Sequence, residues 1–257
     1  MANLHFVKQG QGPVVVLSHA LGCNLHMWDD VAAALQDRYT VVRYDHRGHG
    51  LSETRQTPFS IDDMADDTAA LIEEVVGEPV HFVGLSMGGM VAQSMGARYP
   101  QWVKSIVIAN SAQHYDEAAQ SLWKTRVQNV LSHGVASISE GAMQRWFTPA
   151  FRSDLLHGGA ARVLSLKAEL EQCKPAAYAA SCEAIANIDF RESNLHIGCP
   201  ALVIAGDKDE ATPTALSVAI NHAITGSQLC SIDAAHLSAV EQPAQFARLL
   251  TDFWKAI

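Results

Sequence analysis

Ser86 lies in a Gly-x-Ser-x-Gly motif, which can turn a serine hydroxyl into a nucleophile. The segment GLSMG, residues 84–88, follows an apolar run and precedes a helical pattern. Such a strand-to-helix turn holds the serine in a strained backbone conformation, and glycines on either side make room for it. The motif therefore predicts that Ser86 is a nucleophile. The alternative is a glycine-rich strand-to-helix turn that has the same sequence pattern and no catalytic role.

A serine nucleophile needs a base, and the base needs a group that orients it. After this type of turn the acid and then the histidine are expected in chain order. Asp209 lies in the loop after the apolar run 201–207, and His236 lies in the loop after the run 228–233. We predict that Ser86, Asp209 and His236 form a catalytic triad.

Two other carboxylates, Asp207 and Glu210, compete for the role of the acid because they lie in the same loop. Asp207 comes directly at the end of the expected strand and is poorly placed to reach across to His236. Asp209 lies further into the loop and before the helix start signalled by Thr212 and Pro213. We expect the two spare carboxylates to cap a helix or to lie in solvent.

Acyl transfer also requires two N–H donors aimed at the oxyanion of the intermediate. The first candidate is the backbone N–H of Met87, which follows the nucleophile at the start of a helix. The second is the N–H of Leu21, in the turn HALG at residues 19–22. These two groups are predicted to form the oxyanion hole.

Four histidines lie close together in the sequence and raise the question of a metal site. They are His19, His26, His46 and His49. Their spacing matches no known ligand set, and no pair of carboxylates completes one. We therefore expect neither a metal nor a cofactor.

Short β-branched runs alternate with longer amphipathic runs, as in parallel strands joined by crossover helices. The run PVVVLSH shows no polar alternation, which is typical of a strand buried on both faces. Strands are predicted at residues 13–19, 39–45, 80–86, 103–110, 201–207 and 228–233, and helices at residues 28–35, 61–76, 87–98 and 243–254. This order predicts a mostly parallel, doubly wound α/β sheet.

Residues 111–189 interrupt this alternation with Ala-rich helical sequence and no convincing strand. We predict a helical cap here, inserted in a core formed by residues 1–110 and 190–257, with both parts in a single structural unit. The cap carries 7 Lys and Arg against 8 Asp and Glu, whereas the core carries 11 against 19. An anion would therefore meet the least repulsion at the cap.

Arg145 and Trp146 in this segment are the candidate substrate-binding residues. A guanidinium can bind a substrate carboxylate with two hydrogen bonds, and an indole can form the wall of an apolar pocket. The alternative is that the arginine is solvated or paired and that the tryptophan only packs.

Composition excludes several classes of protein. The chain has 257 residues, of which 48% are hydrophobic and 18% charged, and a formal charge of −9 that argues against a nucleic-acid surface. Neither a signal peptide nor a membrane span is indicated. The five scattered cysteines favour reduced thiols in a cytoplasmic protein whose partner is a small-molecule substrate.

Five segments together resemble the α/β-hydrolase family, and they occur in its order. They are HALG at 19–22, RYDHRGHG at 43–50, GLSMGG at 84–89, GDKDEATP at 206–213 and DAAH at 233–236. Further segments resemble 3-oxoadipate enol-lactonases and closely related esterases: LHMWD at 25–29, RWFTPAFR at 145–152 and YAASCEAI at 178–185. The resemblance implies an α/β-hydrolase fold and a serine hydrolase of carboxylic esters or lactones that works through an acyl-enzyme.

Two features depart from the enol-lactonases. Those proteins usually have a polar residue and then Ser-Leu-Gly in the oxyanion loop, where this chain has His19 and Ala20 before Leu21. The amino terminus is also short for the family, so the opening antiparallel hairpin is expected to be reduced or missing. The alternatives are a general short-chain carboxylesterase, with perhydrolase activity in addition, and a ligand-binding receptor on a hydrolase scaffold.

Overall fold

A computed structural model describes residues 3–54 and 58–257. Within them, seven strands form one sheet in the order β1-β3-β2-β4-β5-β6-β7. The strands are β1 (Phe6–Gly10), β2 (Val14–Ser18), β3 (Thr40–Tyr44), β4 (Val80–Leu85), β5 (Val103–Ala109), β6 (Ala201–Gly206) and β7 (Gln228–Ile232). All neighbouring strands are parallel except β1 and β3. The predicted mostly parallel, doubly wound α/β sheet is confirmed.

Six of the strands match the predicted runs to within one residue at each end. Every residue of β2 and β6 is buried, whereas β7, at the edge of the sheet, is mostly exposed. The strand β1 was not predicted because it lies at the edge of the sheet, where its residues FVKQG alternate between exposed and half-buried. It is the only described strand before β2, and it pairs with β3.

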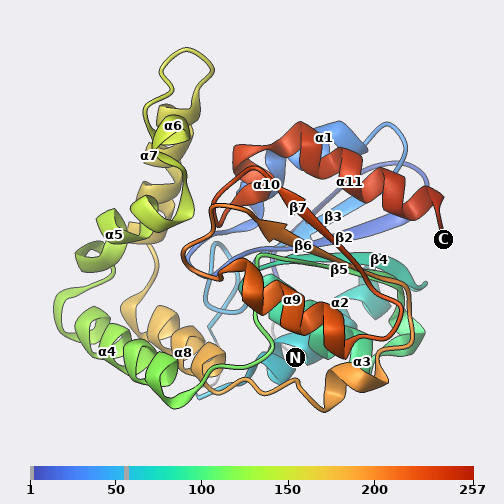
Figure 1. Cartoon of the computed structure of the whole chain (residues 1–257), viewed down its shortest axis with the longest axis horizontal. Helices are drawn as coiled ribbons and strands as arrows, with labels where there is room; N and C mark the ends of the chain where they lie inside the picture. Colours follow the sequence, from blue (N-terminus) through green and yellow to red (C-terminus); the bar gives the residue numbers. More distant parts are fainter. Residues whose placement is uncertain (1–2, 55–57) are drawn as a thin grey trace.

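Helices cover both faces of the sheet (Figure 1). α1 (Asp29–Leu35), α10 (Ser238–Glu241) and α11 (Pro243–Lys255) lie on one face, and α2 (Ile61–Val75), α3 (Met87–Arg98) and α9 (Thr214–Ala223) lie on the other. α2 begins with a capping box in which Ser60 and Asp63 bind each other's backbone N–H. None of the described helices is long and apolar enough to cross a membrane.

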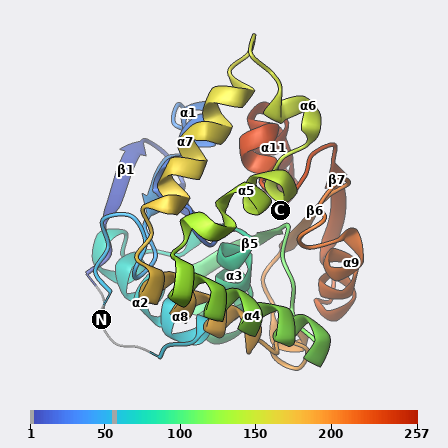
Figure 2. The ribbon, with the colours of Figure 1, turned by 90° about the vertical axis from the view of Figure 1, so that its left-hand side faces the viewer.

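Five helices follow one another between β5 and β6, without an intervening strand. They are α4 (Glu117–His133), α5 (Ala136–Trp146), α6 (Pro149–Arg152), α7 (Gly159–Glu171) and α8 (Pro175–Ala186). Within the group, α4 packs on α8 and α5 packs on α7. They stand to one side of the sheet in Figure 1, and Figure 2 views the molecule from that side. A single β-bridge joins His114 to Asp189. The chain therefore leaves the sheet region and returns to it at nearly one place.

Candidate active site

Ser86 lies at a sharp turn between β4 and α3. Its backbone angles are φ 58° and ψ −113°, a conformation that residues other than glycine rarely adopt. A Cβ atom on Gly84 would lie 1.9 Å from the carbonyl oxygen of Gly88, and one on Gly88 would lie 2.1 Å from that of Ser18. The two glycines are therefore required for the turn that presents the Ser86 hydroxyl.

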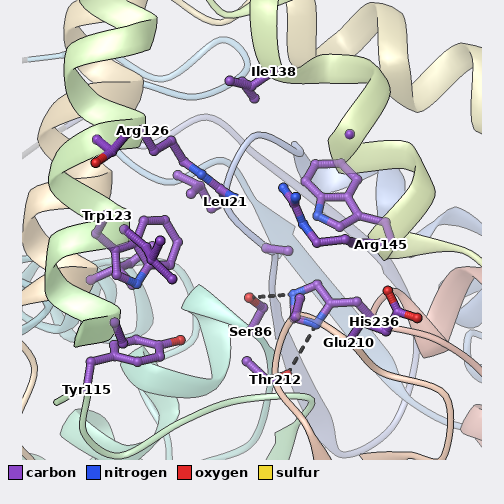
Figure 3. A pocket seen from close by; sticks show the side chains of 18 of the residues that line it. Leu21, Ser86, Tyr115, Trp123, Arg126, Ile138, Arg145, Glu210, Thr212 and His236 are labelled. Atoms are coloured by element: carbon purple, nitrogen blue, oxygen red, sulfur yellow. Dashed lines mark hydrogen bonds between the residues drawn. The ribbon is translucent and has the colours of Figure 1, made fainter.

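The structure brings Ser86, His236 and Asp209 into one hydrogen-bonded row. The Oγ atom of Ser86 lies 3.0 Å from Nε2 of His236, and Nδ1 of His236 lies 2.8 Å from Oδ2 of Asp209. All three residues are buried, and Figure 3 shows the imidazole pointing at the serine. A neutral imidazole that donates from Nδ1 to the carboxylate leaves Nε2 free to accept the serine proton.

The Asp209 carboxylate is held by several donors besides His236. It accepts hydrogen bonds from the backbone N–H of Thr212 at 2.9 Å, from the Thr212 hydroxyl at 2.7 Å and from Nδ2 of Asn110 at 2.9 Å. Burial opposes ionisation, but the charge of His236 and the hydrogen bonds from His236 and Thr212 lower the pKa of Asp209 to about 2. The group is therefore a carboxylate near neutral pH.

Asn110 and Thr212 were not predicted as part of the site. Asn110 follows β5 directly, and its Oδ1 accepts a hydrogen bond from the Ser238 hydroxyl at 2.6 Å, which fixes the orientation of the amide. The only sequence signal for Asn110 is its position at the carboxyl end of an expected parallel strand. Such ends meet at the edge of the sheet where ligands bind.

The competing carboxylates lie elsewhere. Asp207 and Glu210 are exposed, and neither forms a hydrogen bond with His236 among the described residues. Neither caps α9, because the residue before its first turn is Pro213. Glu210 lies at the wall of the cavity described below.

Leu21 and Met87 both present unused backbone N–H groups. Leu21 lines a cavity, described below, together with Ser86 and His236. Met87 is the first residue of α3, and its side chain is fully buried. Within the described part of the chain, neither N–H donates a hydrogen bond. Neither N–H group is therefore occupied by another group of the described residues.

A cavity of about 590 Å³ lies between the Ser86 turn and the helices α4 and α5. Arg145 and Trp146, the two candidate binding residues, both line it. Trp146 is buried and lies close to the turn at residues 19–22, because a Cβ atom on Gly22 would lie 3.5 Å from the Trp146 ring. The cavity has the size of a small-molecule site.

Arg126 and Trp123 also line the cavity, and the sequence analysis missed both. The guanidinium of Arg126 lies over the Trp123 ring, 4.8 Å from its centroid. The two residues are three apart on α4 and so share one face of the helix. That spacing is the signal that could have found them, but it does not say which face of α4 covers the site.

The two arginines bring two positive charges to the cavity, against the single carboxylate of Glu210 in its lining. Figure 3 shows the guanidinium groups of Arg126 and Arg145 pointing inward from opposite sides. No described carboxylate forms an ion pair with either group within 4 Å. Burial and then the charge of Arg126 lower the pKa of Arg145. A bound anion would relieve this repulsion.

The four early histidines do not form one cluster. His19, His46 and His49 pack together in the interior, whereas His26 is exposed and lies beside Asp29. In the described residues, no group of three or more His, Cys, Asp or Glu side chains is arranged to hold a metal ion.

Comparisons with known proteins agree over nearly the whole chain. A family model described as alpha/beta hydrolase fold matches residues 13–243. The chain is 37% identical over 245 residues to 3-oxoadipate enol-lactonase 2 of Acinetobacter baylyi, with 95% of this chain and 90% of that protein covered. It is 34% identical over 247 residues to 3-oxoadipate enol-lactonase 1 of the same organism, with the same coverage.

A solved structure shows the same architecture. The enol-lactonase from Burkholderia xenovorans LB400 superposes with a TM-score of 0.93 at 29% identity, over 99% of this chain and 97% of that chain. The resemblance therefore extends through the helices between β5 and β6 as well as through the sheet.

Proposed function

The chain belongs to the α/β-hydrolase family, and on that premise we propose that it opens a carboxylate-bearing enol-lactone, as a 3-oxoadipate enol-lactonase would. The observation that carries the proposal is the hydrogen-bonded row from Ser86 through His236 to Asp209, with Ser86 and His236 at the wall of the cavity. The unpaired guanidiniums of Arg126 and Arg145 support an acidic substrate.

Acylation begins when the Ser86 Oγ attacks the lactone carbonyl carbon and His236 Nε2 takes the serine proton. The carbonyl oxygen becomes an oxyanion, which the N–H groups of Leu21 and Met87 stabilise. The ring C–O bond then breaks, and His236 returns the proton to the leaving enol oxygen. The enol stays tethered to the acyl group and tautomerises to a ketone, which helps to drive the opening forward.

Deacylation repeats the same steps with water. His236 takes a proton from a water molecule, whose oxygen forms a bond to the acyl carbon, and the bond from that carbon to Ser86 Oγ breaks with return of the proton to the serine. Throughout, Asp209 holds the Nδ1–H tautomer of His236 and stabilises the imidazolium that forms. If the substrate already carries a carboxylate, the product leaves the site with two, because hydrolysis of the acyl-enzyme forms the second.

The helices α4 to α8 act in this proposal as a cap on a core formed by residues 1–110 and 190–257. Their near-neutral charge and the two inward guanidiniums favour entry of an anion into a protein whose formal charge is −9. All five cysteines are free thiols, which supports the further proposal of a cytoplasmic location.

A substrate panel tests the proposed function. The panel contains the enol-lactone of 3-oxoadipate, simple neutral lactones and p-nitrophenyl esters of increasing chain length. We expect kcat/KM to be highest for the acidic enol-lactone, by about 10-fold or more, because charged hydrogen bonds contribute ~1.5–3 kcal/mol. Fast turnover of short esters with no enol-lactone opening would instead indicate a carboxylesterase. Binding without turnover of any of them would indicate a receptor.

Removing either guanidinium should lower kcat/KM most for the acidic substrate. We expect Arg145→Ala and Arg126→Ala to lower kcat/KM for the enol-lactone by about 10- to 100-fold and for a neutral aryl ester by less than about threefold. Steady-state kinetics on both substrates gives the comparison. Lys124→Ala is the matched control, because it removes an exposed cation from α4 that does not line the cavity. Equal losses on the two substrates would rule out carboxylate binding by these arginines.

A further inference from the structure

Three buried histidines lie directly beneath the turn that carries Leu21. His19 follows β2, whereas His46 and His49 lie in the loop after β3. The ring centroid of His19 lies 4.6 Å from that of His46 and 5.3 Å from that of His49. The reaction proposed above uses none of these imidazoles directly. Two of them, His19 and His49, form hydrogen bonds with the backbone of the Leu21 turn, whereas the His46 ring is bonded to the Ser18 hydroxyl.

His19 fixes the peptide that carries the Leu21 N–H. Its Nε2 atom accepts a hydrogen bond from the backbone N–H of His46 at 2.9 Å, so a neutral ring carries its proton on Nδ1. From Nδ1 it donates to the carbonyl oxygen of Ala20 at 2.8 Å. In a trans peptide the Ala20 carbonyl and the Leu21 N–H point in opposite directions. Holding that carbonyl therefore aims the N–H away from His19.

His49 fixes the next peptide along the turn. The backbone N–H of Cys23 donates to the Ala20 carbonyl oxygen at 3.2 Å, and Gly22 has φ 74°, as in a type II turn. The Gly22 N–H donates to Nε2 of His49 at 3.1 Å. A type I turn would flip this peptide and lose that hydrogen bond. Both peptides that flank Leu21 are thus held by imidazoles.

Both hydrogen-bond patterns require neutral rings. Each Nε2 atom accepts from a backbone N–H, which a protonated nitrogen cannot do. Burial, followed by the charge of His19, lowers the pKa of His49 to about 3. Burial likewise lowers the pKa of His19. The rings therefore remain acceptors near neutral pH.

We propose that His19 and His49 are positioning residues that hold the Leu21 N–H toward the oxyanion of the acyl intermediate. The inference rests on the proposed function, in which Leu21 supplies one of the two oxyanion donors. Neither imidazole touches the substrate in this proposal, so both act through the backbone of the turn. Their loss should weaken stabilisation of the transition state while leaving substrate binding intact.

Paired variants test each histidine. His19→Asn keeps an amide donor near the position of Nδ1, whereas His19→Gln keeps only an acceptor near Nε2. His49→Gln keeps an acceptor for the Gly22 N–H, and His49→Leu removes it. We expect His19→Gln and His49→Leu to lower kcat by about 10² to 10³, the range for a lost oxyanion donor, and the other two variants by less than about fivefold.

Two readouts separate positioning from a general structural role. KM for a p-nitrophenyl ester should stay within about threefold of wild type in all four variants. The affinity for a trifluoromethyl ketone, whose serine adduct places an oxyanion in the hole, should fall together with kcat. Thermal unfolding followed by circular dichroism establishes that each variant is folded. His81→Ala is the control, because this half-buried histidine on β4 packs on Trp254 and, among the described residues, forms its one side-chain hydrogen bond with Ser105.

The outcomes separate the two proposals. Equal kcat values for both members of each pair, or losses that appear only in KM, would overturn the positioning role while leaving the esterase intact. A wild-type protein that neither opens the enol-lactone nor hydrolyses any ester would overturn the proposed function itself. Because the two histidines give independent pairs, an unfolded variant at one position leaves the other pair decisive.

Discussion

Ser86→Ala is expected to lower kcat by about 10⁶-fold while the protein keeps its fold, the magnitude seen when the nucleophile of a serine triad is removed. The substitution deletes only the hydroxyl that lies 3.0 Å from His236 Nε2. The oxyanion donors and the cavity remain, so weak residual catalysis should survive. Steady-state hydrolysis of a p-nitrophenyl ester, with circular dichroism to establish folding, measures the effect.

Ser94→Ala is the matched control for this loss. Ser94 is also buried and lies on α3, but its hydroxyl donates to Asp62 at 2.6 Å, away from the cavity. We expect this variant to retain activity within about threefold. A folded Ser86→Ala protein with wild-type turnover would show that the nucleophile is another group.

Asp209→Asn should have the second largest effect, a loss in kcat of about 10⁴-fold. The asparagine amide can stabilise the wrong tautomer of His236, with the proton on Nε2 where the Ser86 proton must be accepted. It also lacks the negative charge that stabilises the imidazolium. Because the pKa of Asp209 is about 2, the wild-type carboxylate stays ionised across the range in which rates are measured. A pH profile of kcat should therefore show no acidic limb that belongs to Asp209.

Two further variants, Asp207→Asn and Glu210→Gln, test whether Asp209 and not another carboxylate of the same loop is the acid. Both residues lie in the same loop but are exposed and form no hydrogen bond with His236 within the described residues. On a neutral ester we expect each variant to lose less than about threefold. A larger loss for Asp207→Asn than for Asp209→Asn would move the acid to the strand end.

The sheet could be predicted because most of its strands are buried on both faces. Continuous apolar runs such as β2 and β6 are recognisable without any knowledge of their neighbours. The edge strand β1 has a half-polar sequence, and it becomes a strand only through its antiparallel pairing with β3. Its existence depends on a contact that local sequence does not encode.

The candidate site likewise contains residues that the sequence predicts and residues that it does not. Ser86 sits in a local motif, and its expected partners follow from chain order and strand ends. Asn110 and Arg126 carry only a strand end and a helical spacing as signals, and neither reveals a role that depends on contacts made by folding. Asn110, for example, reaches a carboxylate 99 residues away in the chain. His19 and His49 are also not recognisable from sequence spacing, since their hydrogen bonds go to the backbone.

Covalent labelling with a fluorophosphonate, followed by peptide mass spectrometry, tests the proposed nucleophile most directly. The reagent phosphonylates an activated serine and releases fluoride, and it needs the same base as the ester reaction. We expect one adduct per chain, on Ser86, with labelling slowed strongly in His236→Ala. Adducts on a different residue, or ester hydrolysis that continues in fully labelled protein, would show that Ser86 is not the nucleophile.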